Sequence, residues 1–337
     1  MAPSSKLSSS DLSESDLSEI DVMETDGQAS WLDGGFTWLA RLFAFCTVAV
    51  LVWMTWVIFR QALPAIREYG LEFLWSQDWS IGDLVFGALP YLYGTVVSST
   101  IALLLAIPIG LAVAMVTSEN FLPTWVRSPL AFIVELIAAI PSVIIGLWGI
   151  FVLIPFLLPI QLWLFDTLNW IPLFSTEPFG PGMLVAGVIL AIMILPTMAA
   201  ISRDVLLAIP QELRSASGAL GATRWETIFR VMLPAAIPGL LGAATLALGR
   251  ALGETMAVTM VIGNSPQISP SLLNLAYTIP AVLANEFGEA LDDLHIGALM
   301  YLALILFALT LAVNVLAVLL VQTVGSASQS ATVYRGR

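Results

Sequence analysis

Residues 296–322 read IGALMYLALILFALTLAVNVLAVLLVQ, a run without a single charged side chain. The run exceeds the ~20 apolar residues that an α-helix needs to cross the hydrocarbon core of a bilayer. Backbone amides find no water to bond with in lipid, so such a segment satisfies them internally by forming a helix. The stretch therefore predicts a membrane-spanning helix.

Working outward from this run, five further uncharged or nearly uncharged stretches have the same character, and polar islands separate them. They cover residues 42–59, 84–118, 136–165, 178–202 and 231–262. The third is expected to begin near Pro129 with Glu135 in its first turns, and Arg250 and Glu254 interrupt the fifth. The chain is therefore predicted to be all-α and polytopic, with about six transmembrane helices.

The composition excludes a soluble fold. Hydrophobic residues make up 58% of the 337-residue chain and charged residues only 11%, whereas a soluble domain carries about 25% charged residues. Such a chain cannot coat a water-facing surface, so its main partner is expected to be the lipid bilayer. It has no basic patch that would indicate binding to nucleic acid.

The polar ends of the chain differ from its apolar middle. The N-terminal segment alternates serine with acid (SSSDLSESDLSEIDVMETD) and predicts a disordered, solvated tail. The expected divisions are a disordered acidic tail over 1–33, the first transmembrane helix and an external loop over 34–83, a membrane core domain over 84–325 with a cytoplasmic loop over 204–230, and a short cytoplasmic tail over 326–337.

The distribution of Lys and Arg predicts the orientation, because these residues concentrate in cytoplasmic loops. With a cytoplasmic N-terminus, most of the 12 basic residues fall inside, and Arg60 and Arg67 fall outside. The inside set is Lys6, Arg41, Arg127, Arg203, Arg214, Arg224, Arg230, Arg335 and Arg337. Both termini are then cytoplasmic.

The loop between the fourth and fifth helices reads IPQELRSASGALGATRWETIFRVMLP over residues 209–234. Gly221 can end a first helix by taking a left-handed conformation. Thr223 can cap a second helix, and Glu226 completes a T-x-x-E capping box. This loop is predicted to be an amphipathic helix pair under the membrane that presents a knob to a soluble partner.

At this point the chain resembles a family, the permeases of ABC importers. Their coupling loop has the pattern E-A-A, three residues, Gly, nine residues, I-x-L-P. The matching positions here are Ser215, Ala216, Ser217, Gly221, Leu233 and Pro234. Ser215 and Ser217 depart from the family's Glu and Ala, and Val231 replaces its Ile. In the family the short helix of this loop docks into a groove on an ATPase subunit.

Four longer stretches narrow the resemblance to the C-type permease subunit of bacterial high-affinity phosphate importers. They are YGTVVSSTIALLLAIPIGLAVA from Tyr93, ELIAAIPSVIIGLWGIFVLIP from Glu135, ILAIMILPTMAAISRDVLLAIP from Ile189 and LALGRALGETMAVTMVIGN from Leu246. The resemblance implies a type I permease fold in the bacterial cytoplasmic membrane. It also implies a second related permease subunit, two copies of an ATP-binding subunit and an extracytoplasmic phosphate-binding protein as partners.

Two charges within the fifth span are the candidate substrate-pathway residues. A charge at mid-bilayer costs about 2.5–3.5 kcal/mol on insertion scales, so Arg250 and Glu254 require a reason. They lie four residues apart and are expected to pair on one helix face. A guanidinium suits an oxyanion such as phosphate, which Arg250 would meet while Glu254 positions it and weakens its grip. The alternative is an ion pair that only fixes helix packing, and Gly249 and Gly253 would admit a second helix beside it.

No catalytic or metal site is expected. The chain has no P-loop, no H-E-x-x-H and no G-x-S-x-G motif, so it is not predicted to be an enzyme, and ATP and Mg²⁺ would be bound by a partner ATPase. The single cysteine, Cys46, and the single histidine, His295, provide no metal-ligand spacing, and His295 is expected to be solvated just outside the sixth helix.

Three alternative functions stay open from the residues alone. One is a permease for another oxyanion or polar nutrient, such as molybdate or sulfate. The second is a secondary transporter or channel that needs no ATPase. The third is a membrane scaffold or signalling subunit.

Between the third and fourth helices, prolines and tryptophans such as Pro155, Trp163 and Trp170 predict a loop at the level of the lipid headgroups.

Overall fold

The computed structural model describes residues 27–119 and 123–333, and describes side chains over residues 35–119 and 123–323. Most of the predicted acidic tail and the last residues of the predicted C-terminal tail lie outside these ranges. The helices are α2 (Gly27–Tyr69), η1 (Glu72–Leu74), α3 (Leu89–Ser118), α4 (Thr124–Ala139), α5 (Ser142–Trp148), η2 (Gly149–Leu153), α6 (Ile154–Leu168), η3 (Pro172–Phe174), α7 (Met183–Leu207), α8 (Gln211–Ala219), α9 (Arg224–Thr227), η4 (Ile228–Met232), α10 (Leu233–Gly253), α11 (Met256–Val261), α12 (Ile279–Glu286) and α13 (Asp293–Val333).

The predicted all-α membrane architecture is confirmed. Six helical segments of the described residues are long and apolar enough to cross a membrane. They are Gly35–Tyr69, Leu89–Ser118, Ser142–Leu168, Met183–Leu207, Arg224–Gly253 and Asp293–Thr323. Each overlaps one of the predicted spans, because uninterrupted hydropathy is the strongest signal that a sequence gives of its membrane segments.

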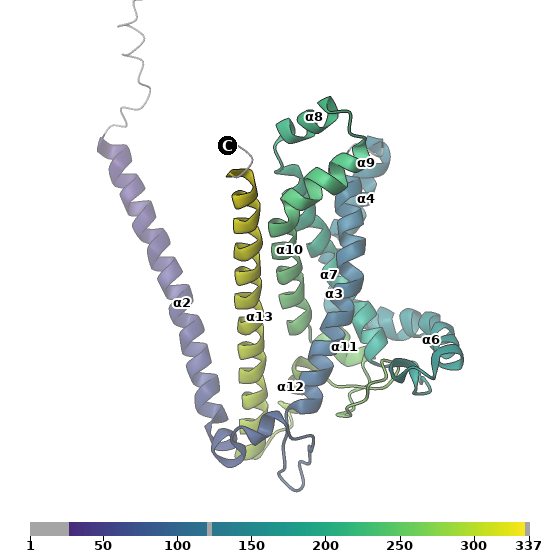
Figure 1. Cartoon of the computed structure of the whole chain (residues 1–337). Helices are drawn as coiled ribbons and strands as arrows, with labels where there is room; N and C mark the ends of the chain where they lie inside the picture. Colours follow the sequence, from purple (N-terminus) through teal and green to yellow (C-terminus); the bar gives the residue numbers. More distant parts are fainter. Residues whose placement is uncertain (1–26, 120–122, 334–337) are drawn as a thin grey trace, which may run out of the picture. The chain divides into compact units, whose positions relative to one another are not determined.

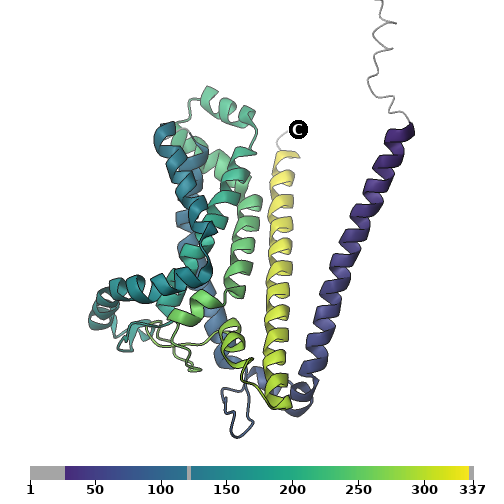
Figure 2. The ribbon, with the colours of Figure 1, turned by 180° about the vertical axis from the view of Figure 1, so that it is seen from behind.

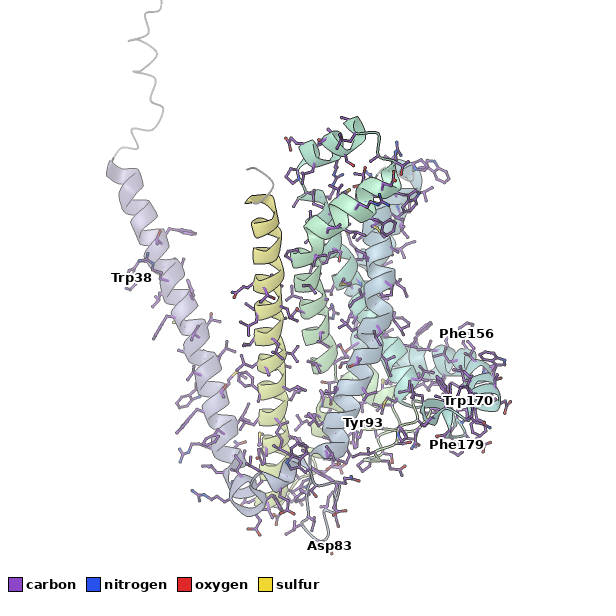
Figure 3. The ribbon with its side chains drawn as sticks, viewed as in Figure 1. Trp38, Asp83, Tyr93, Phe156, Trp170 and Phe179 are labelled. Atoms are coloured by element: carbon purple, nitrogen blue, oxygen red, sulfur yellow. The ribbon has the colours of Figure 1, made fainter. Side chains whose placement is uncertain are left out.

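The chain divides into two compact units between Val57 and Ile58. In the first unit, the described side chains belong to the first part of α2, and its large apolar residues, such as Trp38, are exposed (Figure 3). Exposure of this kind along a helix fits a lipid environment, in which apolar side chains need no protein cover.

The second unit is built around α7, the most buried of the predicted spans. Its buried residues lie on all sides of the helix, and α3 packs along it (Figure 2). Small side chains on α3, including Ala102 and Ala106, are fully buried in this contact. Because lipid removes most of the hydrophobic drive for helix association, close packing through small residues holds such a bundle together.

The second unit has two ends that carry different elements. The loop end carries α8 and α9, and the far end carries α12 and the start of α13 (Figure 1). A separate aromatic core lies at the far end, where Phe73, Phe86 and Tyr91 are buried against the first turns of α13. The two ends are therefore structurally distinct, one bearing an exposed helical loop and the other a packed aromatic cluster.

The third predicted span differs from the expectation. Residues 124–139 form a separate helix, α4, so Glu135 lies near its end instead of in the first turns of a span. Ile140 is extended, with ψ 127°, because a residue before proline is pushed out of the helical region. Pro155 and Trp163, predicted to lie in a loop, belong to α6, which runs across the direction of α7 and α13 in Figures 1 and 2.

Two π-helical segments explain how Pro155 and Pro234 follow a preceding helix without ending it. The segments η2 and η4 each end two residues before a proline, Pro155 and Pro234 respectively. Proline lacks an N–H and its ring clashes with the carbonyl four residues earlier. The wider π turn relieves both problems by shifting the hydrogen-bond register at that point.

Candidate functional site

Arg250 lies in the last turn of α10, and its side chain is exposed. Its Nη1 donates a hydrogen bond of 3.2 Å to Oγ1 of Thr197 on α7. In Figures 1 and 2, α10 ends partway along α13 instead of at the far end. The unpaired carbonyls at the C-terminus of a helix favour a positive charge, which helps to stabilise Arg250 in an apolar region.

The predicted pairing of Arg250 with Glu254 is wrong. The helix α10 ends at Gly253, and Glu254 takes an extended conformation with ψ 127°. Residues four apart face each other only on a continuous helix, so the break removes the expected geometry. Within the described ranges, Arg250 has the neutral Thr197 as its hydrogen-bond partner and forms no ion pair. The fifth span also does not continue to Ile262, because a separate helix, α11, begins at Met256.

The helix break exposes polar groups at this point of the bundle. Thr255 Oγ1 donates to the Gly253 carbonyl across 3.2 Å, and Thr259 Oγ1 donates to the Thr255 carbonyl across 2.7 Å. The Gly253 carbonyl belongs to the last turn of α10, where carbonyls lack a partner within the helix, whereas the Thr255 carbonyl also accepts the backbone N–H of Thr259 across 3.0 Å. Arg250, Glu254 and Thr255 therefore form a polar break between two apolar helices.

The side of α10 next to Arg250 is open. A Cβ atom added at Gly242, Gly249 or Gly253 would meet no side chain or neighbouring segment of the described residues within 4 Å, whereas one at Gly239 would collide with Val205. Since 242, 249 and 253 recur at helical spacing, they form one stripe on the helix surface. The structure thus leaves room beside Arg250 for an element from outside this chain.

The predicted loop over 209–234 is confirmed as a helix, turn and helix. The first helix, α8, ends at Ala219, and Gly221 takes the left-handed conformation with φ 82°. Thr223 and Glu226 form the predicted capping box, in which the Thr223 backbone N–H donates to Glu226 Oε2 across 2.9 Å. We call residues 209–234 the docking loop. Its local sequence signals, a glycine stop and a reciprocal cap, fix its shape.

The motif residues of the docking loop have distinct places. Ser217 is buried, and its Oγ lies 2.9 Å from Thr227 Oγ1, which joins α8 to α9. Ser215 and Ala216 are exposed on α8. Leu233 and Pro234 begin α10. The loop therefore holds its motif positions through one internal bond and leaves the rest of α8 accessible.

Two aromatic residues form an exposed apolar patch on the second half of the docking loop, and Leu213 and Leu220 are exposed on its first half. Trp225 and Phe229 stack with ring centroids 5.9 Å apart, and both are exposed. Ile228 and Met232, between and after them, are buried against α3 and α7. Ile228 and Met232 therefore anchor the segment to the bundle, and Trp225 and Phe229 form a projecting apolar surface, as the sequence predicts.

An ion pair that the sequence did not indicate ties the docking loop to the bundle. Arg214 Nη1 lies 2.8 Å from Glu119 Oε1, and Arg214 Nη2 donates to the Leu206 carbonyl across 2.8 Å. Glu119 follows directly after the uncharged run of α3. A lone acid at that position is the signal that could have singled it out.

Other charged positions gather at the loop end. Glu135, Arg203 and Asp204 line a cavity of about 140 Å³ between α3, α4 and α7. The Nε of Arg203 is buried without a hydrogen-bond partner. The structure therefore brings Glu135 of α4 next to Arg203 and Asp204 of α7.

The prediction for His295 is wrong. Its side chain is only 3% exposed and stacks on Phe86 with ring centroids 5.2 Å apart. Its Nε2 lies 3.2 Å from Glu286 Oε2, which also accepts a hydrogen bond of 3.0 Å from Trp79 Nε1. The imidazole is buried because loop residues distant in sequence fold over the first turn of α13.

No group of three or more metal-ligating side chains occurs in the part of the chain that the structure describes.

Comparison with known proteins gives consistent matches. A protein family described as binding-protein-dependent transport system inner membrane components matches residues 106–326. A protein of Mesorhizobium japonicum named phosphate transport system permease protein PstC is 45% identical over 258 residues, covering 75% of this chain and 79% of its own. A protein of Haemophilus influenzae with the same name is 39% identical over 297 residues, covering 87% and 94% of the two chains.

A solved structure supports the fold at lower similarity. A crystal structure of a bacterial ABC transporter involved in the import of the acidic polysaccharide alginate matches with a TM-score of 0.54 and 17% identity. The match covers 86% of this chain and 98% of that chain. At this identity the likeness concerns the arrangement of helices.

Proposed function

Because this chain belongs to the family of binding-protein-dependent transport system inner membrane components, we propose that it imports inorganic phosphate as the permease subunit of an ATP-driven transporter. Relatives named phosphate transport system permease proteins are 45% and 39% identical over 75% and 87% of this chain, which supports phosphate over molybdate, sulfate or another nutrient. A permease of this family works with an ATPase and a substrate-binding protein, which argues against a lone secondary transporter.

The exposed guanidinium of Arg250 is the observation that carries the proposal. An arginine within an apolar span costs about 2.5–3.5 kcal/mol on insertion scales, so a purely structural role is poorly compensated by one bond to a neutral threonine. A guanidinium offers planar, paired donors that match a tetrahedral oxyanion. Arg250 would therefore line the translocation pathway and bind phosphate transiently.

Glu254 would act in the same pathway by repulsion. It lies directly after the last residue of α10, at the polar break. A carboxylate close to an anion-binding guanidinium weakens the binding of the anion, because like charges repel at short range. Weak binding favours release, and release is what a transport site requires.

The partner subunits would occupy the surfaces that the chain leaves open. A second, related permease would pack on the α10 stripe of Gly242, Gly249 and Gly253, which small residues allow. One of two ATP-binding subunits would receive Trp225 and Phe229 of the docking loop. Those subunits would bind ATP and Mg²⁺, and this chain would hold no cofactor of its own.

The orientation follows from the same assignment. The docking loop would face the cytoplasm, where ATP is available, and both chain termini would lie on that side of the bacterial inner membrane. An extracytoplasmic phosphate-binding protein would then deliver its cargo at the far end. The excess of Lys and Arg in the loops assigned to the cytoplasm supports this orientation.

Reconstitution tests the proposal. The complex of this chain with its partner subunits is placed in liposomes, and ATP-dependent uptake of labelled phosphate is followed with and without unlabelled molybdate or sulfate. We expect uptake that only unlabelled phosphate suppresses strongly, and loss of uptake with Arg250→Gln and with Glu254→Gln. Undiminished uptake in both variants at equal complex content would contradict the pathway role, and suppression by sulfate or molybdate alone would contradict the substrate.

A further inference from the structure

We propose that Arg214 is a positioning residue that ties the docking loop to the bundle, so that a movement of α8 moves the loop ends of α3 and α7 with it. The inference rests on the proposed function, because such a tie matters only if a partner subunit moves the loop. It assigns a role to an ion pair that lies outside the coupling motif.

The guanidinium of Arg214 joins three elements at once. One nitrogen, Nη1, lies 2.8 Å from the carboxylate of Glu119, the residue that follows α3. The other, Nη2, donates across 2.8 Å to the carbonyl of Leu206 in the last turn of α7. The planar guanidinium reaches both partners at once, Glu119 as an ion pair and Leu206 through a hydrogen bond, which the single nitrogen of a lysine would not do equally well.

The Arg214–Glu119 pair is better shielded than the other arginine–carboxylate pair of the loop region. The Arg214 and Glu119 side chains are 25% and 21% exposed, whereas Arg230 and Glu226 are 79% and 45% exposed and 4.0 Å apart. Exposed pairs contribute little because water and salt screen them, and screening weakens as the charges withdraw from solvent. The Arg214–Glu119 contact is therefore the stronger of the two.

Apolar packing does little to hold α8 in place. Of its residues only Ser217 is buried. A cavity of about 290 Å³ is lined by Arg214 and Gly218 of α8 together with Thr227 of α9 and Met232 of η4, so α8 does not pack fully against the segment that follows it. Because few apolar contacts fix α8, its polar ties determine how closely it follows the bundle.

Leu206, whose carbonyl accepts the hydrogen bond from Arg214, lies in a closely packed cluster. Leu206 is fully buried in a cluster with Ala114 of α3, Ile228 and Met232 of η4 and Ala236 of α10. Close-packed clusters transmit displacement because they deform little. A pull on the Leu206 carbonyl is thus a pull on the loop ends of α3, α7 and α10 together.

The same helix leads to the candidate substrate site. Thr197, the hydrogen-bond partner of Arg250, precedes Leu206 on α7 by nine residues, or roughly 13 Å of helix. A continuous chain of contacts therefore runs from α8 through Arg214, Leu206 and α7 to Arg250. These contacts couple α8 to the Arg250 site only if substitution of the contacting residues changes transport, which an experiment must measure.

The test measures ATP hydrolysed per phosphate imported by the reconstituted complex. We compare the wild type with Glu119→Gln, Arg214→Gln and the double variant. We expect each single variant to raise the ratio about tenfold and the double variant to raise it no further, because residues that act as one contact are not additive. A role confined to folding would lower the amount of assembled complex but leave the ratio unchanged.

Two further variants complete the design. Arg67→Gln removes an exposed arginine from the far end of the unit and should keep the wild-type ratio. Arg214→Lys keeps the charge and should restore part of the coupling. If the Arg214→Gln complex assembles poorly, the ratio of ATP hydrolysed to phosphate imported is taken from Glu119→Gln, which keeps a neutral acceptor. A wild-type ratio in Glu119→Gln would overturn the role of the Arg214–Glu119 pair, whereas absence of ATP-driven phosphate uptake in the wild type would overturn the proposed function itself.

Discussion

Arg250 and Thr197 are joined by a hydrogen bond of 3.2 Å, from the guanidinium Nη1 of the arginine to the Oγ1 of the threonine. The bond links the last turn of α10 to the central helix α7. Because threonine is neutral, it orients the guanidinium without cancelling its charge. A carboxylate partner would have competed with an incoming anion for the same donors.

Replacement of this threonine by its isostere is the first prediction. Thr197→Val keeps the volume and removes the acceptor, so Arg250 loses its orientation. We expect the KM for phosphate to rise about tenfold, which corresponds to about 1.4 kcal/mol, the scale of a hydrogen bond to a charged group. Initial rates of labelled phosphate uptake at varied concentration give the value.

A matched threonine provides the control. Thr100 on α3 is exposed, whereas Thr197 is half-buried, and the Thr100 Oγ1 donates a hydrogen bond of 2.7 Å to the Val96 carbonyl of its own helix. Thr100→Val should leave the KM unchanged, because a hydroxyl bonded to its own helix positions no other side chain. Equal KM values in Thr197→Val, Thr100→Val and the wild type would contradict the positioning role of Thr197.

The second prediction concerns the contact between α3 and the segment before α12. A Cβ at Gly94 would collide with the backbone oxygen of Tyr277, which cannot turn aside as a flexible side chain can. We expect Gly94→Ala to destabilise the complex by about 1–3 kcal/mol, as overpacking does. Thermal unfolding of the detergent-solubilised complex measures the change.

Gly35, on α2, is the matched position for that substitution. It is also helical, and an added Cβ would meet no atom of another described segment within 4 Å. Gly35→Ala should be neutral or stabilising, because alanine favours helix over glycine by up to about 1 kcal/mol. A Gly94→Ala complex that melts with or above the Gly35→Ala complex would refute the close approach at Tyr277.

Local signals account for the parts of the fold that the sequence predicts well. Uninterrupted hydropathy defines the spans, and the docking loop follows from Gly221 and the capping box of Thr223 and Glu226. Proline alone is a weaker signal. Pro141 ends a helix, but Pro196 and Pro238 lie inside α7 and α10. Neighbouring helices decide which prolines the bundle accommodates.

The site depends on contacts between distant segments, which periodicity does not reveal. Arg250 and Glu254 satisfy the spacing of a helical pair, yet the helix ends between them. The partner that Arg250 has instead, Thr197, lies 53 residues away in the chain. The Glu119–Arg214 pair and the burial of His295 likewise arise only when separate helices meet.

The third prediction tests the turn of the docking loop. Gly221 has φ 82°, a conformation that costs a residue with a Cβ about 1–2 kcal/mol. Gly221→Ala should therefore distort the turn between α8 and α9 and reduce the amount of ATP-binding subunit that co-purifies with the complex. Gly218→Ala, three residues earlier, adds a Cβ into open space within α8 and should retain the partner. Equal recovery of the partner in both variants would contradict a requirement for the left-handed turn.

The fourth prediction tests which side of the membrane the docking loop faces. Leu220 in the turn after α8 is 90% exposed, and Leu291 before α13 is 95% exposed, so a cysteine at either position is accessible without disturbing a core. Cys46 is the single native cysteine, and replacing it by serine gives a background free of other thiols. In intact spheroplasts, a membrane-impermeant maleimide should label Leu291→Cys and not Leu220→Cys, and lysis should make both reactive. The reverse pattern would place the docking loop outside the cell, where no ATP-hydrolysing subunit could reach Trp225 and Phe229, and the proposed importer would have no source of energy.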